Sequence, residues 1–161
     1  MDLLSEFSIK IYEPPLSHVR SSGHIVNVSD VVCAAMLVVD FETEVSMNAI
    51  ANFIGNATGR YASETVLALE RIGCADEAAA LGRILSVASE AGMTHATVQA
   101  DRGVQRPFAV ASFSQLHDSK WSAALERIGE VFDTIDMARI LGRLDVFMDA
   151  HRAIFEKALG R

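Results

Sequence analysis

Four carboxylates between residues 40 and 64 are the side chains in this sequence that are best suited to binding or catalysis. Asp40 and Glu44 are four residues apart, so a helix would place them on one face, with Glu42 between them and Glu64 further on. Such a group could form an acidic patch for a basic partner, a carboxylate pair for acid–base catalysis, or only a solvated helix end. We take the acidic patch as the hypothesis, because no neighbouring motif supports catalysis.

Three asparagines follow at intervals of four residues and would line a second, polar face of the same region. Asn56 precedes the turn that ends at Gly59, so we expect it to cap a helix or make that turn. For Asn48 and Asn52, recognition and a structural role are equally open. The predicted partner-binding residues are therefore Asp40, Glu42, Glu44, Asn48, Asn52 and Glu64.

The histidines, cysteines and serines form no recognised catalytic or metal-binding motif. The sequence lacks HExxH, HxxxH, CxxC, GxSxG and a phosphate-binding loop. His18 and His24 share one segment but lack the further ligands that zinc needs, and the two cysteines, Cys33 and Cys74, are expected to pack in the core. We therefore predict no catalytic residue, no metal and no cofactor.

The charge is negative and unevenly distributed. The 161 residues carry a formal charge of −7, and residues 26–90 hold 9 acidic against 3 basic side chains, whereas residues 91–161 hold 9 of each. A nucleic-acid binder needs Lys and Arg for the phosphates, so direct nucleic-acid binding is excluded and a partner with a basic surface is expected. The longest apolar run, residues 31–39, is too short to span a bilayer, and the two unpaired cysteines favour a reducing cytoplasm.

The pattern of apolar residues predicts a single all-α domain, a helical bundle with an extended N-terminal arm. Phe7, Ile9 and Ile11 alternate with polar residues up to Pro14-Pro15, which favours an extended arm over residues 1–28 and a helical domain over residues 29–161. Residues 92–118 are irregular, with short extended pieces expected at Val98 or at 108–113. The helices are expected from Ser29-Asp30 through residue 45, then over 47–54, 61–72, 76–91, from 119 onwards, and over 136–159.

Three blocks of the chain resemble the bacterial DNA-mimic protein family, which is known largely as a domain of unknown function. The first runs from Glu44-Val45 to Gly59, the second is Leu69 to Cys74, and the third runs from Glu130 to His151. The resemblance as a whole extends over roughly residues 30–155 and is weak around residues 92–118. At the two-Asn, two-Gly core of the family pattern, this chain has Ser46, Met47, Asn48 and Ala49.

The resemblance implies an all-α fold, dimerisation and no established enzymatic activity. One branch of that family presents carboxylates spaced like DNA phosphates and occupies the DNA-binding surface of a transcription factor. We therefore expect a non-enzymatic protein-binding module, whose partner is a protein with a basic surface such as a transcription factor or a toxin, and which forms a homodimer. An immunity-like or antitoxin-like protein that occludes a toxin, and a small enzyme with a cryptic polar pocket, are the alternatives.

Overall fold

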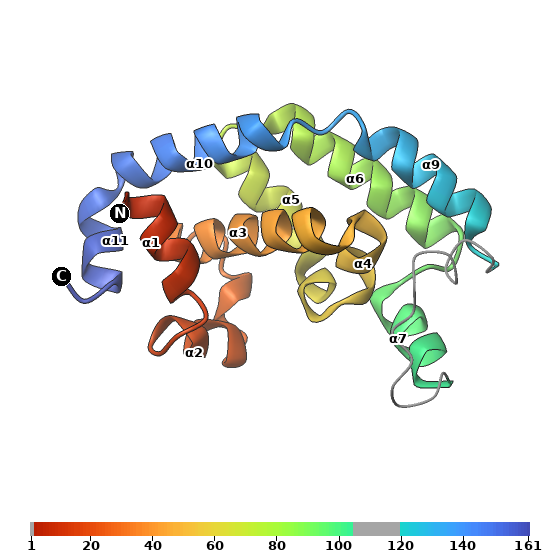
Figure 1. Cartoon of the computed structure of the whole chain (residues 1–161), viewed down its shortest axis with the longest axis horizontal. Helices are drawn as coiled ribbons and strands as arrows, with labels where there is room; N and C mark the ends of the chain where they lie inside the picture. The colour runs from red at the N-terminus through yellow and green to blue at the C-terminus, as the bar shows by residue number, and fades with distance from the viewer. Residues whose placement is uncertain (1, 105–119) are drawn as a thin grey trace.

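The computed structural model describes residues 2–104 and 120–161, apart from the side chains of Asn48 and residues 101–104, and all its regular elements in these ranges are helical (Figure 1). The prediction of an all-α fold is confirmed. None of the described helices combines the length and apolar character needed to cross a bilayer. The elements are α1 (Leu3–Lys10), α2 (Leu16–Ser21), η1 (His24–Val26), α3 (Val31–Asn48), α4 (Ile50–Gly55), η2 (Ala57–Tyr61), α5 (Ala62–Arg71), α6 (Ala75–Glu90), α7 (His95–Val104), α9 (Ser122–Phe132), α10 (Met137–Ala150) and α11 (Arg152–Ala158).

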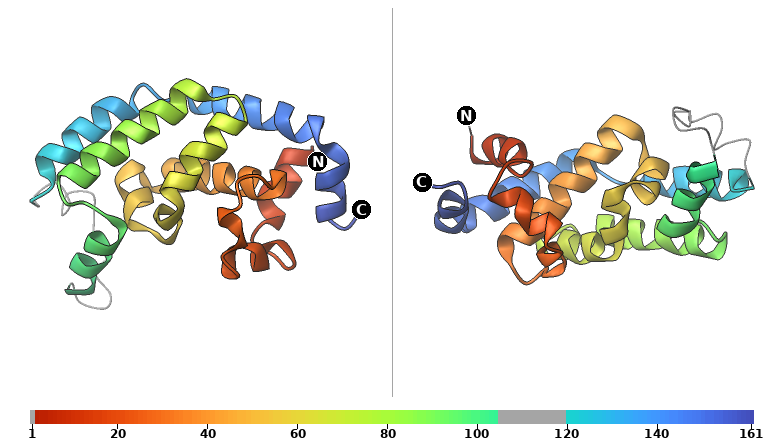
Figure 2. Two further views of the ribbon diagram at one scale, coloured as in Figure 1. Left: turned by 180° about the vertical axis from the view of Figure 1, so that it is seen from behind. Right: turned by 90° about the horizontal axis from the view of Figure 1, so that it is seen from below.

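Helix α3 runs through the middle of the molecule, packed against α4, α5, α10, α11 and both 3-10 turns (Figures 1 and 2). The Asp30 carboxylate caps it by accepting the backbone N–H groups of Val32 and Cys33 at 2.8 and 3.2 Å. Ser29, the expected cap, lies one residue outside. The side chains of residues 33–41 are all buried, which explains why this stretch of sequence lacks a polar face.

Helices α5, α6 and α9 form the second part of the bundle, with α6 lying beside both of its neighbours (Figure 2). Gly73 ends α5 with a φ of +87°, and the Cys74 N–H returns to the Leu69 carbonyl at 2.9 Å, as in a Schellman-type stop. Gly92 ends α6 in the same way, with a φ of +69°. The sequence located both stops correctly.

The extended N-terminal arm is a wrong prediction, because residues 3–10 form helix α1. The Asp2 carboxylate caps this helix at the Ser5 N–H, 2.8 Å away. Leu3, Phe7 and Ile11 recur every four residues and are buried, whereas Ile9 is 53% exposed. The Phe7 ring packs edge-on against Phe155 at 5.2 Å between centroids. These residues share one core with the later helices, while a domain boundary after residue 28 stays a prediction.

Two further expected elements differ from the structure. The short helix expected over 47–54 is present as α4 but begins later, at Ile50, because α3 continues to Asn48 and the chain breaks at Ala49, which has φ 72° and ψ 162°. Met47, expected on the inward stripe, is 75% exposed as a result. The expected final helix is divided at His151 into α10 and α11.

The irregular stretch predicted over residues 92–118 is helical in the part that the structure describes. Val98 belongs to α7 and is buried, not extended. Residues 108–113, the other expected extended piece, lie outside the described residues, as does the expected helix start at residue 119.

Candidate partner-binding surface

Asp40 does not belong to an exposed patch. It is only 5% exposed and forms a bidentate ion pair with Arg20, whose Nη2 and Nε lie 2.7 and 3.1 Å from the two carboxylate oxygens. The Tyr12 hydroxyl donates a third bond of 3.3 Å. Burial raises the pKa of Asp40, and the Arg20 guanidinium opposes that rise only in part. Asp40 is therefore not a solvent-exposed member of the predicted acidic patch, because Tyr12 and Arg20 bond to its carboxylate and Arg20, on α2, supplies the counter-charge.

Glu42 and Glu44 are half-buried on the last turns of α3, and both accept hydrogen bonds from neighbours. Glu42 accepts from the Ser46 hydroxyl at 2.8 Å, one turn further along. Glu44 accepts from the Asn56 amide at 2.6 Å and so ties α3 to the start of η2. The structure thus brings Glu44 and Asn56 together in a hydrogen bond that connects the two elements.

Gly59 lies near this hydrogen bond in the sequence, and its role is steric. A Cβ on Gly59 would lie 2.2 Å from the Phe53 carbonyl oxygen and 2.3 Å from that of Ile54, so only glycine fits beneath the end of α4. Its N–H donates to the Asn56 carbonyl at 3.1 Å, as the predicted turn requires. The block that runs from Glu44 to Gly59 is thus held together by its own residues.

The other predicted residues lie on different elements. Asn52 is half-buried on α4, and Glu64 is half-buried in the first turn of α5, where a carboxylate complements the positive helix end. Asn48 is the last residue of α3, and its side chain lies outside the described part. With Asp40 buried, the other predicted residues whose side chains are described are half-buried groups on α3, α4 and α5. They do not form one continuous acidic edge.

A second set of carboxylates, which the sequence analysis missed, lies along α9. Glu126, Glu130 and Asp133 are exposed and spaced by four and three residues, so they follow one face of the helix and its end. No described side chain forms an ion pair with any of the three. The balanced charge of residues 91–161 concealed this row, although its i, i+4, i+7 spacing is visible in the sequence. We call these three residues the α9 carboxylate row.

An apolar cavity of about 260 Å³ adjoins one end of this row, between α9 and the start of α4. Ile50 from α4 and Leu125, Ile128 and Phe132 from α9 form most of its wall, and Glu126 stands in the same lining. Ala49, the residue at the break between α3 and α4, also lines it. A cavity with this lining suits a single apolar side chain.

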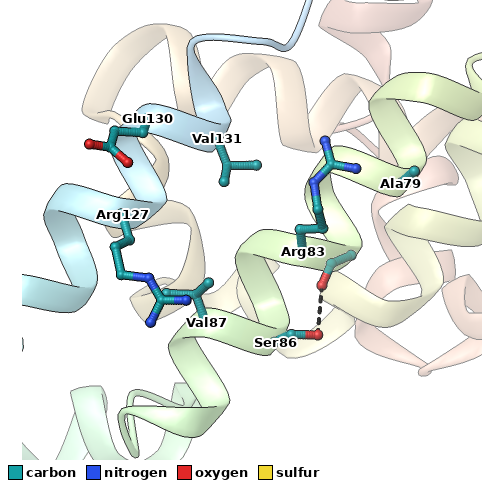
Figure 3. A pocket seen from close by; sticks show the side chains of 8 residues that line it. Ala79, Arg83, Ser86, Val87, Arg127, Glu130 and Val131 are labelled. Atoms are coloured by element: carbon teal, nitrogen blue, oxygen red, sulfur yellow. Dashed lines mark hydrogen bonds between the residues drawn. The ribbon is translucent and has the colours of Figure 1, made fainter.

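A shallower groove of about 660 Å³ separates α9 from α6 (Figure 3). Arg127 and Val131 from α9 face Arg83 and Val87 from α6 across it. The Ser86 hydroxyl donates a hydrogen bond of 3.1 Å to the Gly82 carbonyl. Its lining contains no histidine or cysteine and no hydroxyl paired with a base. Glu130 of the α9 carboxylate row stands in the same lining as Arg83 and Arg127, so the groove is mixed in charge, and it offers no activated nucleophile.

Comparison with known proteins agrees with the resemblance described above. No curated protein and no solved structure matches the sequence. One family model, described as DMP19-like protein, matches residues 27–151, which include α3 to α10 and the whole block from Glu44 to Gly59. The chain therefore belongs to the DMP19-like protein family, a family of DNA-mimic proteins.

Proposed function

We propose that this chain is a non-enzymatic protein-binding module that occupies a basic, DNA-binding surface of a partner protein. The observation that carries the proposal is the α9 carboxylate row, three exposed acidic side chains along one helix that form no ion pair with any described residue. Uncompensated charge of one sign attracts a partner of opposite charge and speeds its association. Family membership supports the same kind of role.

The apolar cavity beside the row supplies the part of binding that charge alone does not. Exposed carboxylates give orientation and association rate, whereas most binding energy comes from a few well-buried apolar anchors. Burying one leucine or phenylalanine side chain of a partner in this cavity would contribute about 1.5–3 kcal/mol. A basic surface that carries one protruding apolar side chain is therefore the expected complement.

The residues predicted from the sequence make up a second part of the proposed surface. Glu42, Glu44, Asn48, Asn52 and Glu64 stay in the proposal as a flanking region over α3 to α5. Asp40 leaves it, because Arg20 already neutralises its buried charge.

The test compares two triple variants with the same change in charge. In the first, the α9 carboxylate row becomes lysine; in the control, Glu70, Glu90 and Asp145, which are also exposed, become lysine. Wild-type protein should capture a DNA-binding protein from extract of its own organism, and added duplex DNA should displace that protein. The row variant should lose at least tenfold in affinity, and the control should bind within about twofold of wild type.

Equal capture by both variants would refute the role of the row. Capture that duplex DNA does not displace would refute the DNA-binding surface as the target, while leaving a protein-binding role. Circular dichroism of both variants would show whether each one keeps its helices.

A further inference from the structure

Three potential metal ligands meet at the start of α3, away from the α9 carboxylate row. His24 comes from η1, Asp30 is the cap of α3, and Cys33 lies in its first turn. One ligand atom from each of the three lies within 4.8 Å of the others. This group could not be recognised from His18 and His24 in the sequence, because the spacing His-x5-Asp-x2-Cys matches no standard zinc motif.

The local fold holds each of the three residues in place. Gly23, with a φ of +77°, turns the chain into η1, and the fully buried Ile25 anchors that turn against α3. One Asp30 oxygen, Oδ1, accepts both helix N–H groups, while Oδ2 has no hydrogen-bond partner among the described residues. The cap therefore fixes the carboxylate and leaves one oxygen available.

Cys33 and His24 differ in exposure in a way that suits metal entry. The Cys33 side chain is 1% exposed, and its thiol donates weakly to the His24 carbonyl at 3.5 Å. The His24 ring is exposed, so it can rotate and admit an ion from solvent. Burial and the nearby Asp30 raise the pKa of Cys33 to about 11, so this thiol is not a reactive thiolate by itself.

We propose that His24, Asp30 and Cys33 bind one zinc-like divalent transition-metal ion, with solvent at the fourth position. A thiolate, an imidazole nitrogen and a carboxylate oxygen bind Zn²⁺ at about 2.0–2.3 Å, which places tetrahedral ligand atoms roughly 3.5 Å apart. The ligand atoms already lie within 4.8 Å of one another, so the group need contract by no more than about 1.3 Å, and rotation of the exposed His24 ring can supply much of that movement. Calcium and magnesium are excluded as preferred ions, because both take oxygen ligands.

The charges around the site also fit a divalent cation. One thiolate and one carboxylate neutralise the ion, and these two anionic ligands outweigh the partial positive charge at the start of α3. Arg71, whose guanidinium binds the Val28 carbonyl, is the nearby opposing charge. A bound ion would join η1 to α3 and so fasten the N-terminal helices to the core.

Cobalt(II) titration of the metal-free full chain tests the proposal, because a thiolate ligand gives a near-ultraviolet charge-transfer band. Wild type should bind one equivalent, and zinc should displace it. Cys33→Ser should abolish the band, whereas Cys74→Ser, at the other buried cysteine, should keep it. Asp30→Asn keeps a capping side chain but should weaken binding at least tenfold.

His24→Gln keeps the test decisive if a substitution at Cys33 prevents folding, because His24 is exposed. It should weaken cobalt binding at least tenfold and reduce the rise in melting temperature that zinc gives to wild type, whereas His18→Gln should change neither. Absence of the band in wild type, equal affinity in His24→Gln and wild type, or loss of the band only in Cys74→Ser would overturn the proposal.

Discussion

Replacing Ala49 with glycine should stabilise the protein, although most alanine-to-glycine changes do the opposite. Ala49 joins α3 to α4 with φ 72° and ψ 162°, a region of backbone conformation that is populated almost only by glycine. Holding a residue with a Cβ there costs about 1–3 kcal/mol.

The expected gain is the strain released minus the extra freedom that glycine adds to the unfolded chain. The second quantity is about 0.5–1 kcal/mol, so Ala49→Gly should raise the free energy of unfolding by roughly 0.5–2 kcal/mol. For a chain of this size, that corresponds to a rise in melting temperature of about 1–8 °C. Urea unfolding followed by circular dichroism measures the free energy, and calorimetry measures the melting temperature.

Ala79→Gly is the matched control, because Ala79 is exposed in the middle of α6, where the backbone is helical. This change should destabilise the protein by about 1 kcal/mol, the ordinary cost of glycine in a helix. The reasoning would be refuted if Ala49→Gly lowered the free energy of unfolding as much as Ala79→Gly does. Ala49→Val should have a lower free energy of unfolding than both glycine variants, because a β-branched side chain tolerates positive φ least.

Three further predictions concern the buried ion pair, the glycine under α4 and the oligomeric state. Arg20→Met should destabilise the protein by about 3–5 kcal/mol at pH 7, because it leaves a buried carboxylate alone. The pKa of Asp40 is already raised in the folded protein, and loss of Arg20 raises it further, so the folded variant takes up a proton more readily than the unfolded chain does. The loss of stability should therefore shrink as pH falls, and Asp40→Asn should partly rescue the variant in urea melts. Gly59→Ala should cost about 3 kcal/mol in the same melts, whereas Gly82→Ala, whose Cβ meets nothing within 4 Å, should gain up to about 1 kcal/mol; equal effects would contradict the steric argument. Light scattering at micromolar concentration should give a dimer of the 17.4 kDa chain, and the mass of a single chain would contradict the dimer.

Local signals in the sequence predicted most of the helical domain. Gly73 and Gly92 end their helices at the expected places, and the Asp30 region begins α3 as expected. These features depend on residues within one or two turns of each other, so a single sequence contains the information. The N-terminal arm failed because Phe7, Ile9 and Ile11 fit a strand, while Leu3, Phe7 and Ile11 fit a helix equally well.

The candidate site was harder to predict, because it depends on contacts between distant segments. Asp40 was expected in a partner-binding patch, and only the three-dimensional structure reveals that Arg20, twenty residues earlier, reaches its carboxylate and takes up its charge. Glu44 and Asn56 are twelve residues apart and meet only after the chain turns at Ala49. The net charge of each segment was also a poor guide to the site. Residues 91–161 carry equal numbers of acidic and basic side chains, and this balance hid the α9 carboxylate row, in which the acidic residues share one face.

The spacing of the α9 carboxylate row limits how closely this chain can imitate a nucleic acid. Seven residues of helix rise about 10.5 Å, so Glu126, Glu130 and Asp133 place three charges along a length in which one DNA strand places roughly four phosphates. If each carboxylate replaced one phosphate, the logarithm of affinity would fall with the logarithm of salt concentration with a slope of about −3. A partner that contacts six to ten phosphates has a much steeper slope for DNA. The complex should therefore resist salt better than the DNA complex that it replaces, with the apolar cavity at Ile50 and Phe132 supplying the remaining affinity.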